Sequence, residues 1–249
     1  MDLASLIGLA LGFGAVFGGA VLEGVHIGAL ISPTSAMIVL GGTFGAVFIS
    51  FPLKACINGF KDAKTVFLPP KVDPEAVVKD IIGYATKARR NGLISLEQEA
   101  QNAKDPFIKK GISLVVDGID PQKLRETLEA EIMAYEDHKK HSVEFYEAAG
   151  GYAPTIGIIG AVLGLIHVMG NLSDTSKLGA GIAAAFVATI YGLMTANIIC
   201  LPMGAKIKIR MKEEVLRRVM IVEGLIAIQN GENPHFIEQK LKAFAGEEH

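Results

Sequence analysis

Four apolar runs in this chain are each long enough to cross a lipid bilayer. They are Leu3–Leu22, Ala29–Leu53, Gly150–Met169 and Leu178–Met203. A helix needs about 20 predominantly apolar residues to span the hydrocarbon core. The chain is 50% hydrophobic yet 20% charged, so its apolar and polar residues are separated into blocks, as is typical of membrane proteins. We therefore predict four transmembrane helices.

Lysine and arginine are distributed unevenly around these runs. Of the 24 such residues, 15 lie in residues 54–148 and 8 follow Gly204, while Lys177 is the remaining one. Because cytoplasmic loops are enriched in Lys and Arg, we expect both termini to be cytoplasmic. The expected parts are a transmembrane hairpin (1–53), a cytoplasmic helical domain (54–148), a second transmembrane hairpin (149–203) and cytoplasmic C-terminal helices (204–249).

The polar segments carry start and stop signals of helices. Asp73 is followed by proline at the first helical position, and Gly92 lies just beyond a basic last turn, which predicts one helix between them. Ser95 and Gln98 have the spacing of a capping box and predict another helix start. Strand-period alternation of useful length is missing. The fold class we predict is therefore an all-α integral membrane protein with a helical cytoplasmic domain.

Two helices are expected to project from the membrane into the cytoplasm. A helix that starts at Pro121 meets no strong breaker before Gly150, so it should run on into the third span. The fourth span should likewise continue through "KIKIRMKEEVLRRVMIVEGLIAI" to Asn230, and a short last helix should start at Pro234. Spans three and four therefore have cytoplasmic extensions.

The four runs carry almost no ionisable side chain. They contain no Asp, Glu, Lys or Arg, and their single histidine is His167, near the outer end of the third run. A charge at the bilayer centre costs about 2.5–3.5 kcal/mol on insertion scales, so carboxylates at depth mark ion pathways. A free-standing channel or transporter would need a polar path that these runs lack. If ions cross here, another chain must supply the protonatable group.

Other function classes find no support in the composition or the motifs. A formal net charge of −2 does not favour nucleic-acid binding. The sequence has no metal-ligand spacing, no phosphate-binding loop and no nucleophile with a matching base, so we do not expect an enzyme, a metal site or a cofactor.

Small residues are concentrated in the third and fourth runs. Glycines recur in "GIIGAVLG", and glycine and alanine dominate "GAGIAAAF". Small residues let helix backbones approach closely. Packing inside one four-helix bundle explains part of this pattern. The small residues exceed what a single neighbouring helix requires, so we favour self-association around a shared centre.

Prolines and hydroxyls occupy the same two runs. Pro154 lies near the start of the third run and Pro202 near the end of the fourth. Each removes a helical hydrogen bond and bends its helix, which produces either a hinge or a fixed kink. Thr155 and Thr189 either bond back to their own helices or face an ion path.

Four motifs resemble the MotA family of flagellar motor stator subunits. "GGYAPTIGIIGAVLGLI" and "AAAFVATIYGLMTANIICLPMGAKIK" are similar to the family's motifs of the third and fourth spans. "ARRNGLISLEQEA" resembles its cytoplasmic signature and "GENPHFIEQKLKAF" its C-terminal signature. The motifs occur in the family's order and cover nearly the whole chain.

The resemblance implies a function. Members of this family assemble as a pentamer around two copies of a single-span MotB-type partner in the bacterial inner membrane. That partner carries the membrane aspartate and binds peptidoglycan, so it supplies the carboxylate that this chain lacks. The complex couples proton flow to torque on the flagellar rotor.

The resemblance also implies site residues. Pro154 and Pro202 fall on the family's two functional prolines, and Thr189 falls on its ion-path threonine. Sodium-driven relatives have a threonine where this chain has Ala161, which favours protons as the transported ion.

The cytoplasmic signature implies a rotor contact. The family's arginine and glutamate that meet a FliG-type rotor protein fall on Arg89 and Glu97, with Arg90 beside them. Solvated helix ends are the other interpretation of these charges. The alternative function is a TolQ/ExbB-like proton-driven energiser of an outer-membrane process, but those relatives have three spans, and the extra N-terminal hairpin disfavours it.

Overall fold

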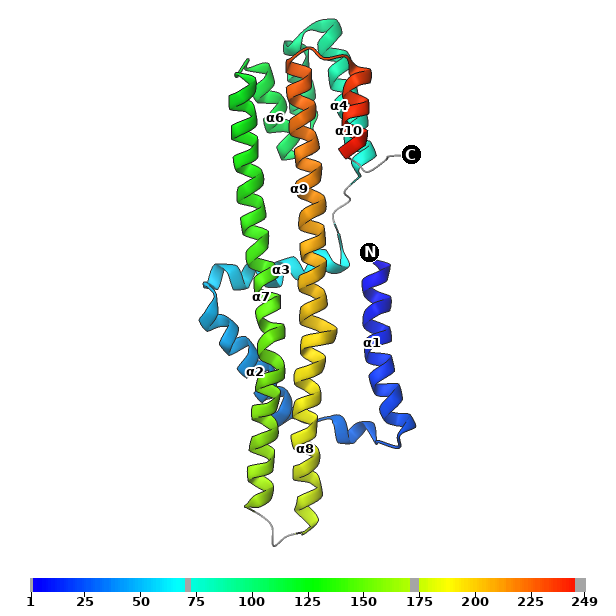
Figure 1. Cartoon of the computed structure of the whole chain (residues 1–249), viewed down its shortest axis with the longest axis vertical. Helices are drawn as coiled ribbons and strands as arrows, with labels where there is room; N and C mark the ends of the chain where they lie inside the picture. The colour runs from blue at the N-terminus through cyan, green and yellow to red at the C-terminus, as the bar shows by residue number, and fades with distance from the viewer. Residues whose placement is uncertain (1, 70–72, 171–174, 245–249) are drawn as a thin grey trace. The chain divides into compact units, whose positions relative to one another are not determined.

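A computed structural model describes residues 2–69, 73–170 and 175–244, with only the backbone of residues 175–177. The described residues form helices and turns without any strand, so the all-α prediction is confirmed. They belong to two compact units (Figure 1). The first unit combines residues up to 69 with 138–209, and the second combines 73–137 with the residues from 210 onward.

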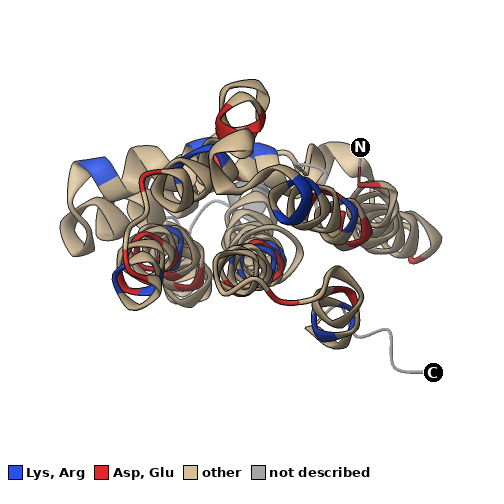
Figure 2. Ribbon diagram, turned by 90° about the horizontal axis from the view of Figure 1, so that it is seen from above, with Lys and Arg blue, Asp and Glu red and all other residues tan. Residues whose placement is uncertain are grey.

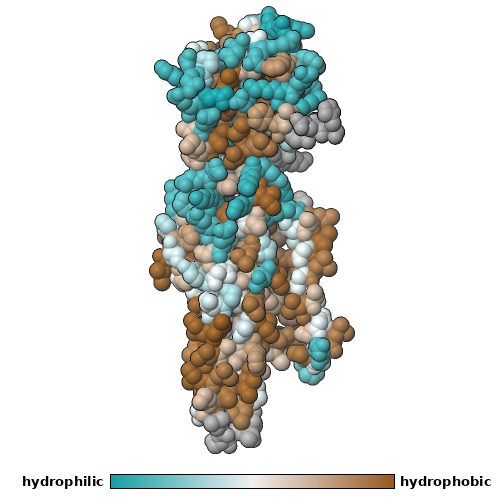
Figure 3. All heavy atoms as spheres, in the orientation of Figure 1, coloured by the Kyte–Doolittle hydropathy of each residue, from teal (hydrophilic) through white to brown (hydrophobic). Residues whose placement is uncertain are grey.

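The first unit contains the apolar helices. α1 (Leu3–Leu22), α2 (Pro33–Ser50), the end of α7 (Pro121–Met169) and α8 (Thr175–Met194) are long and apolar enough to cross a membrane. A short 3-10 helix, η1 (Ile27–Leu30), connects α1 to α2. The visible surface of the α7–α8 hairpin is largely hydrophobic (Figure 3). Four spans were predicted, and four are found.

The second span is shorter than its apolar run. The apolar run extends to Leu53, but α2 ends at Ser50. Leu53 is already the first residue of a separate helix, α3 (Leu53–Phe67). Phe51 is extended, with φ −127° and ψ 147°, because a residue before proline disfavours helical backbone. Pro52 therefore ends the span and allows the chain to turn into α3, which runs across the unit at a steep angle to α7 (Figure 1).

Close packing fixes α3 against α7. A Cβ atom built on Gly59 would lie 2.8 Å from the ring of Phe145, so only glycine fits between the two helices. Asp62 accepts a hydrogen bond from Ser142 (2.7 Å) and pairs with Lys139 (2.5 Å). One face of α3 is therefore committed to α7.

The N-terminus of α1 is also fixed. Asp2 is buried, its carboxylate accepts a hydrogen bond from the backbone N–H of Ser5 (3.1 Å), and it pairs with Lys206 (2.7 Å). The backbone N–H of Asp2 donates to the carbonyl of Phe67 (2.9 Å). A capped helix start with a paired carboxylate connects α1 to the ends of α3 and the fourth span.

The two projecting helices form as predicted. α7 runs without interruption over 49 residues and contains Pro154. The fourth span continues from α8 through a π turn, η3 (Thr195–Cys200), into α9 (Leu201–Gln229). Pro202 has no N–H to donate to the carbonyl of Ile198, and the wider turn lies directly before it. The continuous extensions are confirmed, and the π turn was not foreseen.

The second unit is a helical domain. It contains α4 (Pro74–Asn91), a 3-10 turn η2 (Leu93–Leu96), α5 (Glu97–Asn102), α6 (Pro106–Val116) and α10 (Pro234–Phe244), packed on the adjoining parts of α7 and α9. Its core is apolar, with fully buried side chains that include Ile81, Leu96, Ile112, Leu124, Leu128, Ile221, Leu225 and Ile237. Its visible surface is mostly hydrophilic (Figure 3).

One predicted helix start in this unit is wrong. Ser95 does not cap a helix: its hydroxyl donates to the carbonyl of Gly92 (2.6 Å), and α5 begins at Glu97 without a side-chain cap. The 3-10 turn leaves Ser95 inside the connection rather than at a helix boundary. By contrast Asp73 caps α4 through the N–H of Ala76 (3.1 Å), and Gly92 follows that helix with φ +83°, as predicted.

Candidate functional site

The first group of predicted site residues lies along α7. Pro154 is half-buried, while Thr155 is exposed and donates its hydroxyl to the carbonyl of Tyr152 (2.8 Å). Ala161, about two turns further along, is half-buried. Thr155 therefore lies on a face of α7 that the described part of the chain leaves open.

A seam of small residues joins α7 to α8 beside this group. A Cβ built on Gly157 would lie 3.0 Å from the carbonyl oxygen of Ala188 and 3.4 Å from the Cα of Thr189. One built on Gly164 would lie 2.9 Å from the Cβ of Ala185. Part of the small-residue pattern thus serves packing within the chain, and it brings Thr189 next to the α7 segment that follows Thr155.

The fourth-span proline lies near the same level. Leu201, which precedes Pro202, packs against Gly150, and four residues, or about 6 Å of helix rise, separate Gly150 from Pro154. The two prolines therefore lie on neighbouring helices within a short axial distance. Pro202 itself is exposed and lines a hollow between α1 and the fourth span.

Tyr191, two residues from Thr189, is a positioning residue that the sequence did not reveal. Its hydroxyl donates to the carbonyl of Leu30 (2.7 Å) and accepts the N–H of Ser32 (3.3 Å). Ser35 adds a hydrogen bond from its hydroxyl to the carbonyl of Ala184 (3.2 Å). These bonds fix the start of α2 to α8. The only signal in the sequence is a lone tyrosine in an apolar run, whose partners are far away in the chain.

Around Thr155, α7 and α8 present mainly apolar surface. The exposed large residues on the two helices include Ile158, Ile159, Val162, Leu163, Ile166, Ile182 and Phe186. On α7 they recur at helical spacing beside Thr155 and form one stripe. An apolar stripe of this length lies against lipid or against another chain.

The second group of predicted site residues lies at one edge of the helical domain. Arg89 and Arg90 occupy the last turn of α4, and Glu97 begins α5. All three side chains are exposed, and none has an ion-pair partner within 4.0 Å among the residues that the structure describes. The neighbouring charges Lys87 and Glu99 instead pair with each other (2.7 Å). The three residues therefore lie at the end of α4 and the start of α5, and their side chains are exposed and available to another molecule.

The turn that carries these charges is held rigidly. Leu96 is fully buried, and the hydroxyl and N–H of Ser95 both bond the Gly92 carbonyl (2.6 and 3.1 Å). Ile94 lies between Arg90 and Glu97 in the sequence, and 74% of its surface is exposed. A shallow hollow of about 180 Å³ lies beside Glu97, against α6. The edge combines charge with one apolar side chain on a fixed backbone.

A buried ion network lies within this domain. Arg217 bonds Glu214 (2.7 Å) and Asp105 (2.6 Å), and Arg218 also bonds Glu214 (2.8 Å). Burial alone would raise the pKa of Glu214, but hydrogen bonds and charge from both arginines outweigh burial and lower it. The guanidinium of Arg218 lies 4.2 Å from the ring centre of Tyr135. This network ties α6, α7 and α9 together.

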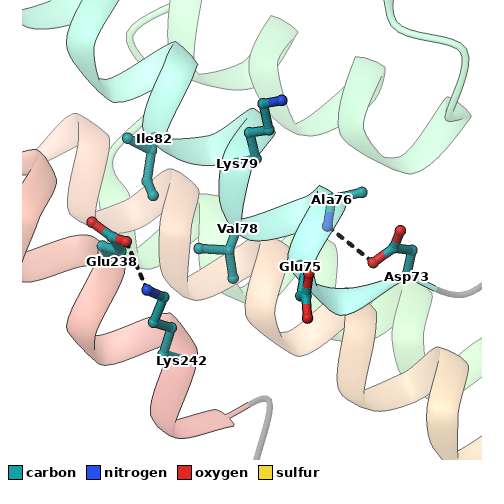
Figure 4. A pocket seen from close by; sticks show the side chains of 8 residues that line it. All are labelled: Asp73, Glu75, Ala76, Val78, Lys79, Ile82, Glu238 and Lys242. Atoms are coloured by element: carbon teal, nitrogen blue, oxygen red, sulfur yellow. Dashed lines mark hydrogen bonds and ion pairs between the residues drawn. The ribbon is translucent and has the colours of Figure 1, made fainter. Parts of the chain in front are cut away.

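A hollow between α4 and α10 does not have the features of a ligand site. It encloses about 710 Å³ between α4 and α10. Figure 4 shows Lys242 paired with Glu238 and Asp73 bonded to the N–H of Ala76, so these charges do not converge on a shared point. Figure 2 shows basic and acidic residues mixed on the same helices. Within the described ranges no His, Cys, Asp and Glu cluster could hold a metal ion.

Comparison with known proteins identifies the family. Residues 99–220 match the model of the MotA/TolQ/ExbB proton channel family, and residues 6–90 match the model of the motility protein A N-terminal region. Motility protein A of Bacillus subtilis is 38% identical over 246 residues, which cover 97% of this chain and 90% of that protein.

Two solved structures are similar over nearly the whole chain. The structure of C. jejuni MotAB has a TM-score of 0.94 and 31% sequence identity, covering 98% of this chain and 96% of that chain. The flagellar MotAB stator complex from Bacillus subtilis has a TM-score of 0.88 and 37% identity, covering 96% and 94%. The chain therefore belongs to the MotA branch of the MotA/TolQ/ExbB proton channel family and is a multi-pass membrane protein.

Proposed function

We propose that this chain is the membrane subunit of a flagellar stator and acts with a MotB-type single-span partner. The observation that carries this proposal is its full-length similarity to chains of MotAB complexes. The apolar spans contain no carboxylate, so the partner provides the protonatable aspartate. This chain contributes the surrounding helices and the lever, and it is not an enzyme.

The mechanism follows from the division of labour between the two chains. A proton that neutralises the partner's aspartate changes the preferred packing of the partner helix against the open stripe of α7. Release of the proton on the other side of the membrane restores the charge of the aspartate. The ring formed by copies of this chain then advances around the partner. One elementary charge that crosses 100 mV supplies about 2.3 kcal/mol, so sustained torque requires many protons in succession. Pro154 and Pro202 transmit the motion between the spans and their extensions.

Self-association as a pentamer accounts for the open apolar faces. Exposed large side chains on α7, α8 and α1 remain after the chain has folded, and a ring of copies around the partner would cover those that face inward. Thr155 and Thr189 then lie near the partner helix and the ion path. Ala161 provides no hydroxyl, which favours protons over sodium.

The rotor contact is assigned to Arg89, Arg90 and Glu97. Opposite charges on a FliG-type protein would meet them through steered, salt-sensitive encounters. This assignment requires both termini and the helical domain to be cytoplasmic, with the spans in the bacterial inner membrane. The distribution of Lys and Arg supports that orientation.

A TolQ/ExbB-like energiser is the alternative function. Residues 99–220 match a family model that includes TolQ and ExbB. The match of residues 6–90 to the motility protein A N-terminal model favours the stator instead, because this region contains the additional hairpin.

Deletion of the gene in its own host tests the stator proposal. Cells that keep filaments but do not swim in soft agar, and that the wild-type gene rescues, are the expected result. Normal swimming together with a defective outer membrane would favour the TolQ/ExbB alternative. The host must lack a second stator set, since a second set would mask paralysis.

A further inference from the structure

One face of α3 carries apolar side chains that stay largely exposed, although the ring of Phe60 also contacts those of Phe44 and Phe145 (5.7 and 5.2 Å between ring centres). Leu53, Ile57 and Phe60 recur at i, i+4 and i+7, which places them on one side of the helix. Their exposed fractions are 70%, 45% and 47%. Leu68, directly after the helix, is 61% exposed. The buried face of α3, with Cys56 and Gly59, is the one that packs on α7.

Basic side chains accompany this stripe. Counted from Leu53, Lys64 is at i+11 and so lies on the same side of the helix as the stripe. Lys54 at i+1 and Lys61 at i+8 lie along one edge of the stripe. All three are exposed, and the described residues offer none of them an ion-pair partner within 4.0 Å. The single acidic residue of α3, Asp62, is turned toward α7, where it pairs with Lys139. The exposed side of α3 therefore combines an apolar stripe with basic side chains, and it carries no acidic side chain.

The position of α3 places this side at a membrane boundary. α2 is a membrane span that ends at Ser50, and α3 follows after a break of two residues at Pro52. Phe48 and Ile49, in the last turn of α2, are also exposed (49% and 90%), so apolar surface continues from the span to α3. Figure 1 shows α3 running across the unit rather than along the spans.

We propose that α3 is an interfacial helix that binds anionic phospholipids of the leaflet at the end of α2. The apolar stripe enters the boundary between headgroups and acyl chains, and the three lysines bind lipid phosphates. Lysine stems can lie along apolar surface while their ammonium groups reach the headgroups. The proposal does not depend on the stator function.

The chemistry of this face favours lipid over a second copy of the chain. Lysine is depleted in the cores of protein interfaces, whereas a basic helix with an apolar face is the pattern of surface-bound membrane helices. The carboxylate of Asp62 is engaged by Lys139, so the three lysines lack an ion-pair partner among the described residues, and an anionic membrane surface attracts them.

Tryptophan fluorescence tests the proposal, because the chain contains no tryptophan. The full chain carrying Phe60→Trp is reconstituted into phosphatidylcholine vesicles or vesicles with phosphatidylglycerol, with brominated acyl chains as quencher. We expect quenching in both, and stronger quenching with phosphatidylglycerol. Leu53→Trp is a second probe in case Phe60→Trp disturbs packing on Phe145. Met133→Trp, on the exposed surface of the helical domain, is the unquenched control.

Charge variants separate the roles of stripe and lysines. Replacing Lys54, Lys61 and Lys64 together by Glu should remove the extra quenching that phosphatidylglycerol causes. The same change at the exposed Lys79, Lys104 and Lys123 should leave it intact. Equal quenching in both lipids, or extra quenching that survives the first triple change, overturns binding of anionic headgroups. No quenching of either α3 probe overturns the membrane location, and shielding from acrylamide would then assign the stripe to a second copy.

Discussion

Gly192 of α8 lies against Ala153 of α7 so closely that no side chain fits between the two backbones. A Cβ on Gly192 would be 2.5 Å from the carbonyl oxygen of Ala153 and 3.1 Å from the Cα of Gly157. Real Cβ atoms do not approach backbone oxygen at that distance. Glycine therefore sets the distance between α7 and α8, close to the segment of α8 that contains Thr189.

Gly192→Ala should separate α7 from α8 and impair rotation. Overpacking in a well-packed interior costs about 1–3 kcal/mol, and here the obstacle is backbone, which cannot rotate away. We expect a lower thermal unfolding temperature in detergent and greatly reduced swimming. Gly179→Ala is the control, because a Cβ built on Gly179 of α8 would meet no described neighbouring atom within 4 Å. Equal effects of both changes would contradict a tight seam.

Pro154→Ala with Pro202→Ala should reduce torque at normal levels of the protein in the membrane. Alanine restores the missing backbone N–H groups and removes the cause of the π turn before Pro202. Rotation speed of tethered cells is the measurement, with immunoblots of membranes as the assembly check. Pro234→Ala, in the first turn of α10 where no helical bond is lost, serves as control. Unchanged torque would leave both prolines as fixed structural kinks.

Charge reversal of the exposed edge should weaken the rotor contact. Arg89→Glu and Glu97→Lys are each expected to reduce swimming while leaving the protein level normal, because neither side chain packs in the core. Reversing the opposed charge on the rotor protein should restore part of the loss. Lys79→Glu, an equal change elsewhere on α4, should have little effect. Binding of purified rotor protein that is insensitive to both salt and these changes would remove the edge from the interface.

Glu214→Gln should destabilise the helical domain in a pH-dependent manner. The folded pKa of Glu214 lies below its ordinary value of 4.5, so the ionised carboxylate stabilises the folded state. Its contribution is complete above about pH 4.5 and is lost as the pH falls through the folded pKa.

The measurement is denaturant unfolding of the variant and the wild type at neutral and acidic pH. Removing one member of a buried ion network costs about 3–5 kcal/mol, and Glu214 and Arg217 are only 14% and 13% exposed. The difference should therefore be large at pH 7 and shrink in acid. Glu129→Gln, at a half-exposed pair, should cost much less. A pH-independent difference would indicate lost packing rather than lost charge.

The sequence was sufficient for the parts of the fold that depend on local signals. Apolar length predicted the four spans, and Asp73, Gly92 and Pro121 correctly marked helix ends because caps act within one turn. Asp105 with Pro106 carries the same start signal and caps α6. Ser95 failed because its hydroxyl found the carbonyl of Gly92 instead of a helix N–H.

Contacts between distant residues were beyond sequence reasoning. Tyr191 bonds the carbonyl of Leu30, Asp2 pairs with Lys206, and Gly59 accommodates Phe145, and in each case the two residues lie far apart in the chain. The π turn before Pro202 depends on how a long helix relaxes around one missing donor. Roles of Thr155, Ala161 and Thr189 depend on a second chain, and so they stay predictions.

The central claim is that this chain generates torque with its single-span partner. The most direct measurement records the rotation of a bead on a single flagellar motor while both proteins are induced in a host whose own stator genes are deleted. The account predicts that rotation speed rises in discrete equal steps as units join, and that a protonophore stops it. A motor that stays still, although both proteins reach the membrane, would contradict the stator function.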